Sequence, residues 1–431
     1  MRSKAYRAIA VNRLDEKQLL QSHEGQDVVV GFDVGKFKMI AMPRWADGTF
    51  DRPWLIHNPE SIAHVVGLLR RFSRNHRLTI ALEPSGTYGD PLRQALGDAA
   101  LTVHRVSPKA VHDQAETFDG VPSQHDGKDA AIVADLASRG KSWPWPFVAR
   151  SEWEQELAYW VDWLDAYRRI RNAWMGRLEA LLARHWPEAT RVMPLATMSL
   201  LQALERYGSP AALAADPQAV ANLTRWGKGW LSPARVQQLL DIARHSMGVR
   251  VGPMDRQRIQ NFAQQAIQAT RQVAKSRRQL RRLAKDRPIL QAQGKALGVP
   301  TACVLWACVG DPHAYGSAAA YRKAMGLNLA ERSSGTYQGR LHLSKRGQPM
   351  TRRWLYLAAA RAVRRYPAVR AWFQAKKARG GQSPGRVALV GIMRRLALAA
   401  HRIAVTGGDF DPNRLFPSTA SKPRGKRKTA K

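Results

Sequence analysis

The sequence predicts an α/β domain followed by a mainly helical region, and three observations support this fold class. Short apolar runs alternate with amphipathic stretches over residues 28–140, as strands and helices of one α/β sheet would. The Pro/Trp-rich segment KSWPWPF at 141–147 interrupts this alternation and is typical of a domain edge. Beyond that segment, apolar residues recur mainly at helical spacing.

The first region contains five predicted strands. They are residues 28–34, 37–44, 49–56, 77–83 and 101–106. Helices are predicted near residues 59–75 and 89–98, after Pro108, and from near Asp126. A meander of three strands followed by alternating helices and strands is the arrangement of the ribonuclease-H-like fold. Asp33 would then lie on the central first strand and Glu83 at the end of the fourth, where α/β folds place their sites.

The second region is predicted to contain two long helices, at residues 151–186 and 253–292. Together they suggest an extended helical insertion or a coiled coil that promotes assembly. The tryptophans of the first are more typical of core or helix pairing than of base stacking. Residues 294–311 indicate a helix, a turn and a helix. We therefore predict four parts: a ribonuclease-H-like domain at 1–145, a helical linker and assembly region at 146–292, a helical C-terminal domain at 293–415, and a basic disordered tail at 416–431.

The chain is strongly basic. Its 431 residues include 69 Lys and Arg against 33 Asp and Glu, which gives a formal net charge of +36. Residues 321–431 hold 26 Lys and Arg against 3 Asp and Glu. Such an excess repels itself unless a polyanion is bound, so nucleic acid is the expected partner. A ribosomal or packaging protein would share this charge, and the charge alone therefore does not indicate catalysis.

Other features favour a cytoplasmic, nucleoid-associated bacterial protein with no membrane partner. We find no apolar run near the roughly 20 residues that span a bilayer, and the N-terminus lacks the apolar core of a signal peptide. Cys303 and Cys308 are too few for a structural zinc site, and reduced buried thiols are the simpler interpretation.

Four carboxylates are the candidate catalytic residues. Asp33 ends the apolar run VVVGFDV, Glu83 ends LTIALEP, and Asp126 and Asp129 are three residues apart at the start of a predicted helix. Carboxylate oxygens suit Mg²⁺ or Mn²⁺, which can assist the cutting of a phosphate backbone. Asp135 is a weaker candidate. His125 and Lys128 flank the pair and are candidate phosphate contacts, although solvent exposure is the simpler interpretation for both.

The segments VVVGFDVGKFKMIAM, ALEPSGTYGDPLRQAL, VHRVSPKAV and HDGKDAAIVADLA, in this order, resemble the DEDD insertion-sequence transposases, a family that includes the Piv-type DNA invertases. The resemblance resumes at GKALGVPTACVLWACVGD and continues through SSGTYQGRLHLSKRGQPMTRRWL. It implies a RuvC-like domain whose acids match Asp33, Glu83, Asp126 and Asp129. The sequence departs from the family at two places. Gln124-His125 stands where the family has Lys-Thr, and Pro300 removes a backbone N–H from the turn at 297–300.

The resemblance also implies a catalytic serine, Ser334, which would attack DNA and form a phosphoserine link. Ser333 is its neighbour, and the sequence does not decide between the two. A serine needs activation, and metal held by the acids would provide it if the two ends of the chain meet, within one subunit or across two. The side chains expected to surround the phosphate are Arg332, Arg340, Lys345 and Arg346.

The predicted function is that of an insertion-sequence transposase or site-specific recombinase that cuts and rejoins double-stranded DNA. A covalent intermediate conserves the phosphodiester energy, and several DNA ends must meet, so we expect a homo-dimer or tetramer. The resemblance implies a guide, or bridge, RNA as a further partner. Two alternatives stay open: a RuvC-like, metal-dependent junction resolvase that activates water, and a non-enzymatic nucleic-acid-binding protein.

Overall fold

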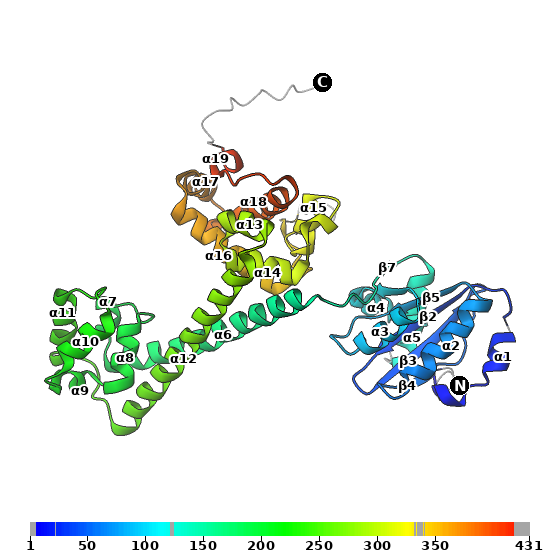
Figure 1. The fold of residues 1–431 in the computed structure, drawn as a ribbon, viewed down its shortest axis with the longest axis horizontal. Coiled ribbons are helices and arrows are strands. Elements are labelled where there is room, and N and C mark those ends of the chain that lie inside the picture. Colours follow the sequence, from blue (N-terminus) through cyan, green and yellow to red (C-terminus); the bar gives the residue numbers. More distant parts are fainter. Residues whose placement is uncertain are drawn as a thin grey trace, which may run out of the picture. The chain divides into compact units, whose positions relative to one another are not determined.

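The computed structural model describes residues 6–21, 23–120, 125–331, 333, 339 and 341–417. The chain divides into two compact units, Met1–Ala149 and Arg150–Lys431, and each is described by itself (Figure 1). An α/β unit followed by a helical unit agrees with the predicted fold class. The finer division of the second unit at residues 292 and 415 stays a prediction.

The described part of the first unit contains one mixed sheet in the order β1-β4-β3-β2-β5-β6-β7. The strands are β1 (Ile9–Ala10), β2 (Val28–Val34), β3 (Lys38–Trp45), β4 (Trp54–His57), β5 (Leu78–Leu82), β6 (Val103–Val106) and β7 (Ser142–Pro144). Strands β2, β3 and β4 form the predicted antiparallel meander. Strands β5 and β6 continue the sheet in parallel with β2. The central strand is therefore β2, as predicted.

Two strand predictions were wrong in detail. The strand predicted over 49–56 begins only at Trp54, because a turn at Gly48 (φ +91°) leaves Phe50 a single bridge to Arg44. Ser142–Pro144 lies inside the predicted Pro/Trp break but pairs with β6 as the edge strand β7. Proline is tolerated at a sheet edge because no ladder hydrogen bond is lost there.

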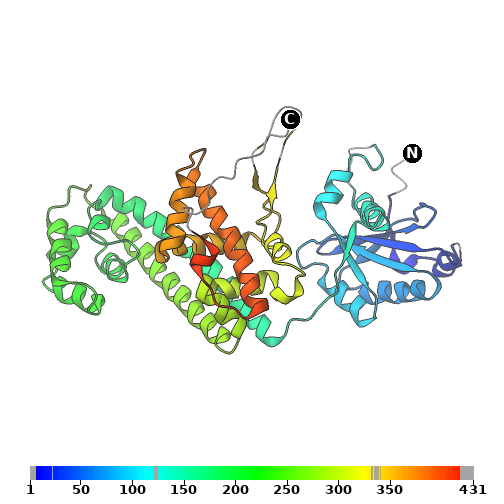
Figure 2. The ribbon, with the colours of Figure 1, turned by 90° about the horizontal axis from the view of Figure 1, so that it is seen from above.

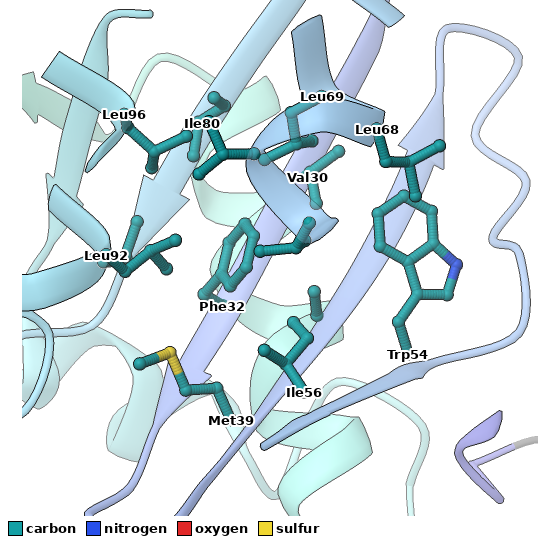
Figure 3. Packing of buried hydrophobic residues seen from close by; sticks show 14 of the residues in the cluster. Val30, Phe32, Met39, Trp54, Ile56, Leu68, Leu69, Ile80, Leu92 and Leu96 are labelled. Carbon is teal, nitrogen blue, oxygen red and sulfur yellow. The ribbon is translucent and has the colours of Figure 1, made fainter. Parts of the chain in front are cut away.

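Helices cover both faces of the sheet. They are α1 (Glu16–Gln21), α2 (Ile62–Asn75), α3 (Asp90–Asp98), α4 (Pro108–Gln114) and α5 (Asp126–Ser138). Helices α2 and α3 pack with Val30 and Phe32 of β2 in one buried cluster (Figure 3). Helices α4 and α5 share a second cluster with Ala81 and Val106. Because side chains alternate along a strand, Gly31 and Asp33 face the α5 side.

The second unit is almost entirely helical. Its helices are α6 (Glu152–His185), α7 (Ala189–Val192), α8 (Met198–Tyr207), α9 (Pro210–Ala215), α10 (Ala219–Gly227), α11 (Pro233–Arg244), α12 (Pro253–Ala284), α13 (Pro288–Leu297), α14 (Val299–Val309), α15 (Ala318–Ala324), α16 (Pro349–Arg365), α17 (Pro367–Lys377), α18 (Pro384–Thr406) and α19 (Pro412–Leu415). A short ribbon of β8 (Leu329–Ala330) and β9 (His342–Leu343), yellow in Figure 2, pairs antiparallel.

The two long helices α6 and α12 pack side by side and antiparallel (Figure 1). A capping box at Ser151 and Glu154 starts α6. The indole N–H of Trp153 donates to the Leu283 carbonyl at 3.1 Å, which joins the start of α6 to the end of α12. The tryptophans of α6 therefore take part in helix pairing, as predicted.

The single helix predicted over 253–292 was wrong at its end. Helix α12 ends at Ala284, and α13 begins at Pro288. Proline has no N–H to continue a helix and disfavours a helical residue before it. Arg287 accordingly has extended backbone angles, φ −122° and ψ 93°.

The two cysteines lie beside this helix pair. Cys303 is buried and Cys308 is half-buried, and both are free thiols. Burial raises the pKa of Cys303 to about 12 and that of Cys308 to about 11. Burial therefore favours the neutral form of both thiols. Among the residues that the structure describes, no helix is both long enough and apolar enough to cross a bilayer.

Candidate active site

The end of β2 places Asp33 beside Glu83. Strands β2 and β5 are parallel, with Phe32 opposite Leu82, so the next residues along the two strands are Asp33 and Glu83. The Glu83 N–H donates to the Phe32 carbonyl at 3.2 Å, which fixes this register one residue past the end of β5. Phe32 and Leu82 point into the same apolar cluster. The two carboxylates, one position on, point to the opposite face.

Helix α5 brings the second pair of acids to that face. Asp126 and Asp129 occupy its first turn, three residues apart, where the positive end of the helix dipole favours negative charge. The helix lies very close to β2 at Gly31. A Cβ atom built there would be 2.4 Å from both the Ala130 carbonyl oxygen and the Ala134 nitrogen. Glycine is therefore required for α5 to reach its position.

The pKa values of these carboxyls indicate that they lie within range of one another. Burial, with repulsion from Asp129 and Asp126, raises the pKa of Asp33 to about 6. Burial, with repulsion from Asp33 and Asp129, raises that of Glu83 to about 7. The pKa of Asp129 is raised by burial and by Asp126. The negative form of each group is thus opposed by its neighbours, and a cation placed among them would relieve this repulsion.

One cation from the chain already lies at this cluster. The ammonium of Lys38, at the start of β3, is 2.5 Å from Asp126 Oδ2. Asp33 adds a further attraction, and the contact with Asp126 raises the pKa of Lys38. The sequence prediction did not include Lys38. Its position follows from the antiparallel β2–β3 pairing, which places Ile40 opposite Asp33, so that Lys38, two residues before Ile40, lies on the same face of the sheet as Asp33.

Asn58, also missed from the sequence, joins the two loops that carry the strand-borne acids. Its side-chain amide donates to the Gly35 and Lys36 carbonyls at 3.1 and 3.2 Å, just after Asp33. The same nitrogen is 3.2 Å from the Tyr88 carbonyl, in the loop after Glu83. A buried polar group held by several partners fixes its surroundings. A polar residue after an apolar strand was the available signal, but it does not identify these partners.

The donor set of the cluster suits a hard divalent ion. Carboxylate oxygens are the ligands that Mg²⁺ and Mn²⁺ prefer, and Mg²⁺ usually retains several waters and takes only one or two carboxylates. No three His, Cys, Asp or Glu side chains are gathered into one coordination sphere among the described residues. The residues thus fit a hydrated ion held by a pair of carboxylates.

Asp135, the weaker candidate from the sequence, has structural partners instead. Asp135 is buried and binds Arg139 at 3.0 Å, Arg44 at 3.4 Å and the Gln114 amide at 2.8 Å. Asp119 accepts from Lys128 at 2.7 Å. Lys128 itself is only 1% exposed. Its expected contact with phosphate, and its expected exposure, are therefore wrong, because α5 is buried nearly all round and its lysine pairs internally.

The predicted serine segment is described only in part. Ser334, Arg332 and Arg340 lie outside the described residues. The hydroxyl of Ser333 donates to Glu331 Oε1 at 2.6 Å and accepts from the Gly339 N–H at 2.9 Å. Ser333 thus serves as a link within this segment.

Lys345 and Arg346 are exposed, and the chain around them is closely held. The Ser344 N–H donates to the Asn328 carbonyl at 2.8 Å. A Cβ at Gly326, which has φ +70°, would be 2.9 Å from the Arg346 carbonyl oxygen. The segment 344–347 therefore lies against the Gly326 turn and presents two cations to solvent.

Comparison with known proteins gives two informative matches. Residues 292–374 match the family described as "Transposase IS116/IS110/IS902 family". A protein of Streptomyces coelicolor, described as "Insertion element IS110 uncharacterized 43.6 kDa protein", is 26% identical over 309 residues, covering 70% of this chain and 76% of that protein. Both matches are to proteins of insertion elements, and the family match lies within the second unit.

Solved structures of Thermus thermophilus RuvC also match. The complex with a Holliday junction substrate is 17% identical, with a TM-score of 0.21, covering 28% of this chain and 99% of that chain. A second RuvC structure is also 17% identical, with a TM-score of 0.20 and coverage of 27% and 99%.

Proposed function

We propose that this protein is a recombinase of an insertion element that cuts and rejoins double-stranded DNA through Ser334, assisted by a divalent cation at Asp33, Glu83, Asp126 and Asp129. The convergence of these carboxylates on one face of the first unit is the observation that carries the proposal. The transposase match over residues 292–374 provides independent support. The order of strands β4-β3-β2-β5-β6 favours the ribonuclease-H-like assignment of the domain that holds the acids.

The serine step transfers a phosphoryl group without net loss of a phosphodiester. The Ser334 oxygen forms a bond to phosphorus, the bond from phosphorus to one DNA oxygen breaks, and the serine proton passes to a general base. A DNA hydroxyl later attacks the phosphoserine and restores the serine. Because each step exchanges one phosphate ester for another, no nucleoside triphosphate is consumed. Arg332, Arg340, Lys345 and Arg346 would hold the phosphate and stabilise its developing charge.

A divalent cation at the acids would stabilise charge on the phosphate and favour the ionised oxygen nucleophile. Asp33 and Glu83, fixed by strand register, are the proposed pair of ligands, and Asp126 and Asp129 from α5 would add negative charge beside the hydrated ion. Lys38 would compete for Asp126 or orient it. The first unit supplies the acids and the second unit supplies the serine, so both are required for the proposed reaction.

The test is incubation of the purified protein with DNA that contains the ends of its own element, with and without Mg²⁺, followed by denaturing electrophoresis. We expect strand cleavage and a covalent protein–DNA adduct, with phosphoserine mapping to Ser334. Ser334→Ala should lose the adduct, and Ser333→Ala, its matched control, should retain it. Cleavage without an adduct would instead favour a junction-resolving nuclease, in which water replaces serine. No loss of function in Asp33→Asn would favour a non-enzymatic binding protein.

Mixing two inactive variants tests how the serine and acids are shared. If Ser334→Ala and Asp33→Asn subunits regain adduct formation when combined, the two parts act across subunits of an oligomer. If the mixture of the two variants forms no adduct, the serine and the acids act within one subunit. Guidance by a bridge RNA is also part of the proposal. RNA that co-purifies with the protein and is needed for activity would support guidance by a bridge RNA. Full activity of RNA-free protein would contradict such guidance.

A further inference from the structure

Five arginines from three helices gather in the second unit, and we call them the arginine cluster: Arg168, Arg171, Arg277, Arg281 and Arg361. They come from α6, α12 and α16, which are labelled in Figure 1. The pair α6 and α12 shares one buried apolar cluster with α14 and with Trp354 of α16. The cluster is therefore carried on packed helices and not on loops, which fixes the spacing of its charges.

Helices α6 and α12 share a buried apolar cluster, and the guanidinium groups that they carry repel one another. Burial and repulsion from Arg171, Arg281 and Arg361 lower the pKa of Arg277. Burial and repulsion from Arg277 and Arg171 also lower that of Arg168. Such an arrangement lowers stability unless an anion is supplied.

The described residues supply few acids to balance this charge. Asp165 is buried and already pairs with Arg353 at 2.5 Å and with Arg169 at 3.1 Å. Helix α12 has no acidic residue after Asp255, and α16 has none. The Nε and Nη1 atoms of Arg168 and the Nε atom of Arg171 are buried without a hydrogen-bond partner among the described residues. Unmet donors of this kind are costly inside a protein.

One end of the cluster lies at the turn between α13 and α14. Arg361 donates to the Leu297 carbonyl at 2.5 Å and to the Thr301 hydroxyl at 3.1 Å. Gly298 in this turn has φ +79°, and a Cβ there would be 2.8 Å from Arg361 Nη1. Pro300 removes one backbone donor from this turn. The guanidinium of Arg361 places charged donors at the same position.

The other end of the cluster is fixed by an aromatic ring. The guanidinium of Arg168 stacks on the indole of Trp354, with its carbon 4.6 Å from the ring centre. Arg277, Arg281 and Arg361 are exposed, whereas Arg168 and Arg171 are half-buried. The exposed members can therefore reach a ligand, while the inner members hold a positive potential beneath them.

We propose that the arginine cluster is a second nucleic-acid site, which binds the phosphodiester backbone of a duplex across α6, α12 and α16 and uses none of the residues predicted for the serine step. Several guanidinium groups held on packed helices suit the repeated negative charge of a phosphate backbone. A second copy of this chain does not fit the same face, because a two-fold interface would place arginine against arginine. The inference rests on the proposed function only in taking nucleic acid as the partner.

The test compares matched pairs of charge removals in the full chain. Arg171→Gln with Arg277→Gln removes one cluster charge from α6 and one from α12. Arg184→Gln with Arg258→Gln removes the same charges from the same helices. These control residues are about 20 Å and 28 Å further along the helices, at 1.5 Å per residue. Binding to short DNA and RNA duplexes of random sequence is measured over a series of salt concentrations in EDTA, so that cleavage plays no part.

We expect the cluster pair to lower the slope of log affinity against log salt by about 1, because Arg277 loses a phosphate contact worth about 0.9 and Arg171, an inner member, makes no direct contact. The control pair should change the slope much less. A change with DNA, with RNA or with both supports the proposal and identifies the duplex. Equal slopes for the cluster and control pairs on both duplexes would overturn it.

A second variant separates charge from folding. Arg171→Lys with Arg277→Lys keeps both charges and should retain most of the salt slope, and thermal unfolding should show both variants folded. If the lysine pair loses as much slope as the glutamine pair, charge is not the cause and the proposal fails. If DNA cleavage fails while this binding difference is found, only the proposed function is lost.

Discussion

The acid cluster of the first unit and the arginine cluster of the second are opposite solutions to the same problem of holding like charges together. In the first, burial and neighbouring carboxylates raise the pKa values of Asp33 and Glu83. In the second, burial and neighbouring guanidiniums lower the pKa of Arg277. Each cluster is electrostatically incomplete in the free chain. We propose that the first binds a cation and that the second binds an anion.

The two clusters are also built differently. Strand register and one glycine contact fix the acids, because β2, β5 and α5 carry them at set positions. The arginines lie on helices separated by up to about 190 residues, and their meeting depends on how those helices pack. Backbone geometry is visible in a sequence pattern, whereas packing between distant helices is not. This difference separates what could be predicted from what could not.

The largest effect is expected from Asp33→Asn, which would remove a proposed principal cation ligand. We predict a loss of DNA strand cleavage of about 10³-fold, as for other groups that stabilise charge in a transition state. Asp98→Asn, at an exposed position on α3 of the same unit, is the matched control and should cleave normally. The measurement is the initial cleavage rate on DNA that contains the element's ends. If Asp33→Asn leaves the cleavage rate unchanged, the acid cluster does not bind the cation that cleavage needs.

Gly31→Ala tests whether close packing of α5 assembles the acids. The new Cβ would approach Ala130 and Ala134 backbone atoms at 2.4 Å, so α5 must move. We expect the free energy of unfolding to fall by about 3 kcal/mol, as in overpacked cores, and cleavage to fall with it. Gly97→Ala has free space around its Cβ. In denaturant unfolding, the free energy of unfolding of Gly97→Ala should equal that of the wild type or be slightly higher. Equal behaviour of the two variants would contradict this role of Gly31.

Asn58→Ala sharpens the account of how the strand loops are held. It removes an amide that donates to three carbonyls near Asp33 and Glu83. We predict a loss of about 2 kcal/mol in the free energy of unfolding, since buried carbonyls lose their partner. A weaker cation affinity in equilibrium titration should accompany it. Lower stability with unchanged cation affinity would show that Asn58 is structural only.

The smallest effect concerns pH. Glu83 has a pKa raised from 4.5 to about 7, so the folded state binds its proton more tightly than the unfolded state does. Stability without metal should therefore fall as pH rises from about 4.5 to 7, by about 1 kcal/mol after allowance for solvent screening. Glu83→Gln should flatten this dependence in urea unfolding with EDTA. If the stability of Glu83→Gln changes with pH as that of the wild type does, the raised pKa of Glu83 is not the cause of the pH dependence.

Much of the first unit follows from local sequence. The run VVVGFDV gives β2 with its predicted bounds, and the acids that end two apolar runs lie at adjacent strand ends because parallel register leaves them level. The short strands β1 and β7 were not predicted, because two or three residues carry too little pattern. Lys128 was misjudged because α5 buries almost its whole circumference, and a lysine there must find an internal partner.

The measurement that tests the account most directly is calorimetric titration of the metal-free protein with Mn²⁺ in the absence of DNA. The account predicts saturable binding in the wild type and in Asp98→Asn, and a loss of that binding in Asp33→Asn and Glu83→Gln. Equal Mn²⁺ binding by the wild type and both acid variants, or none in the wild type, would contradict it.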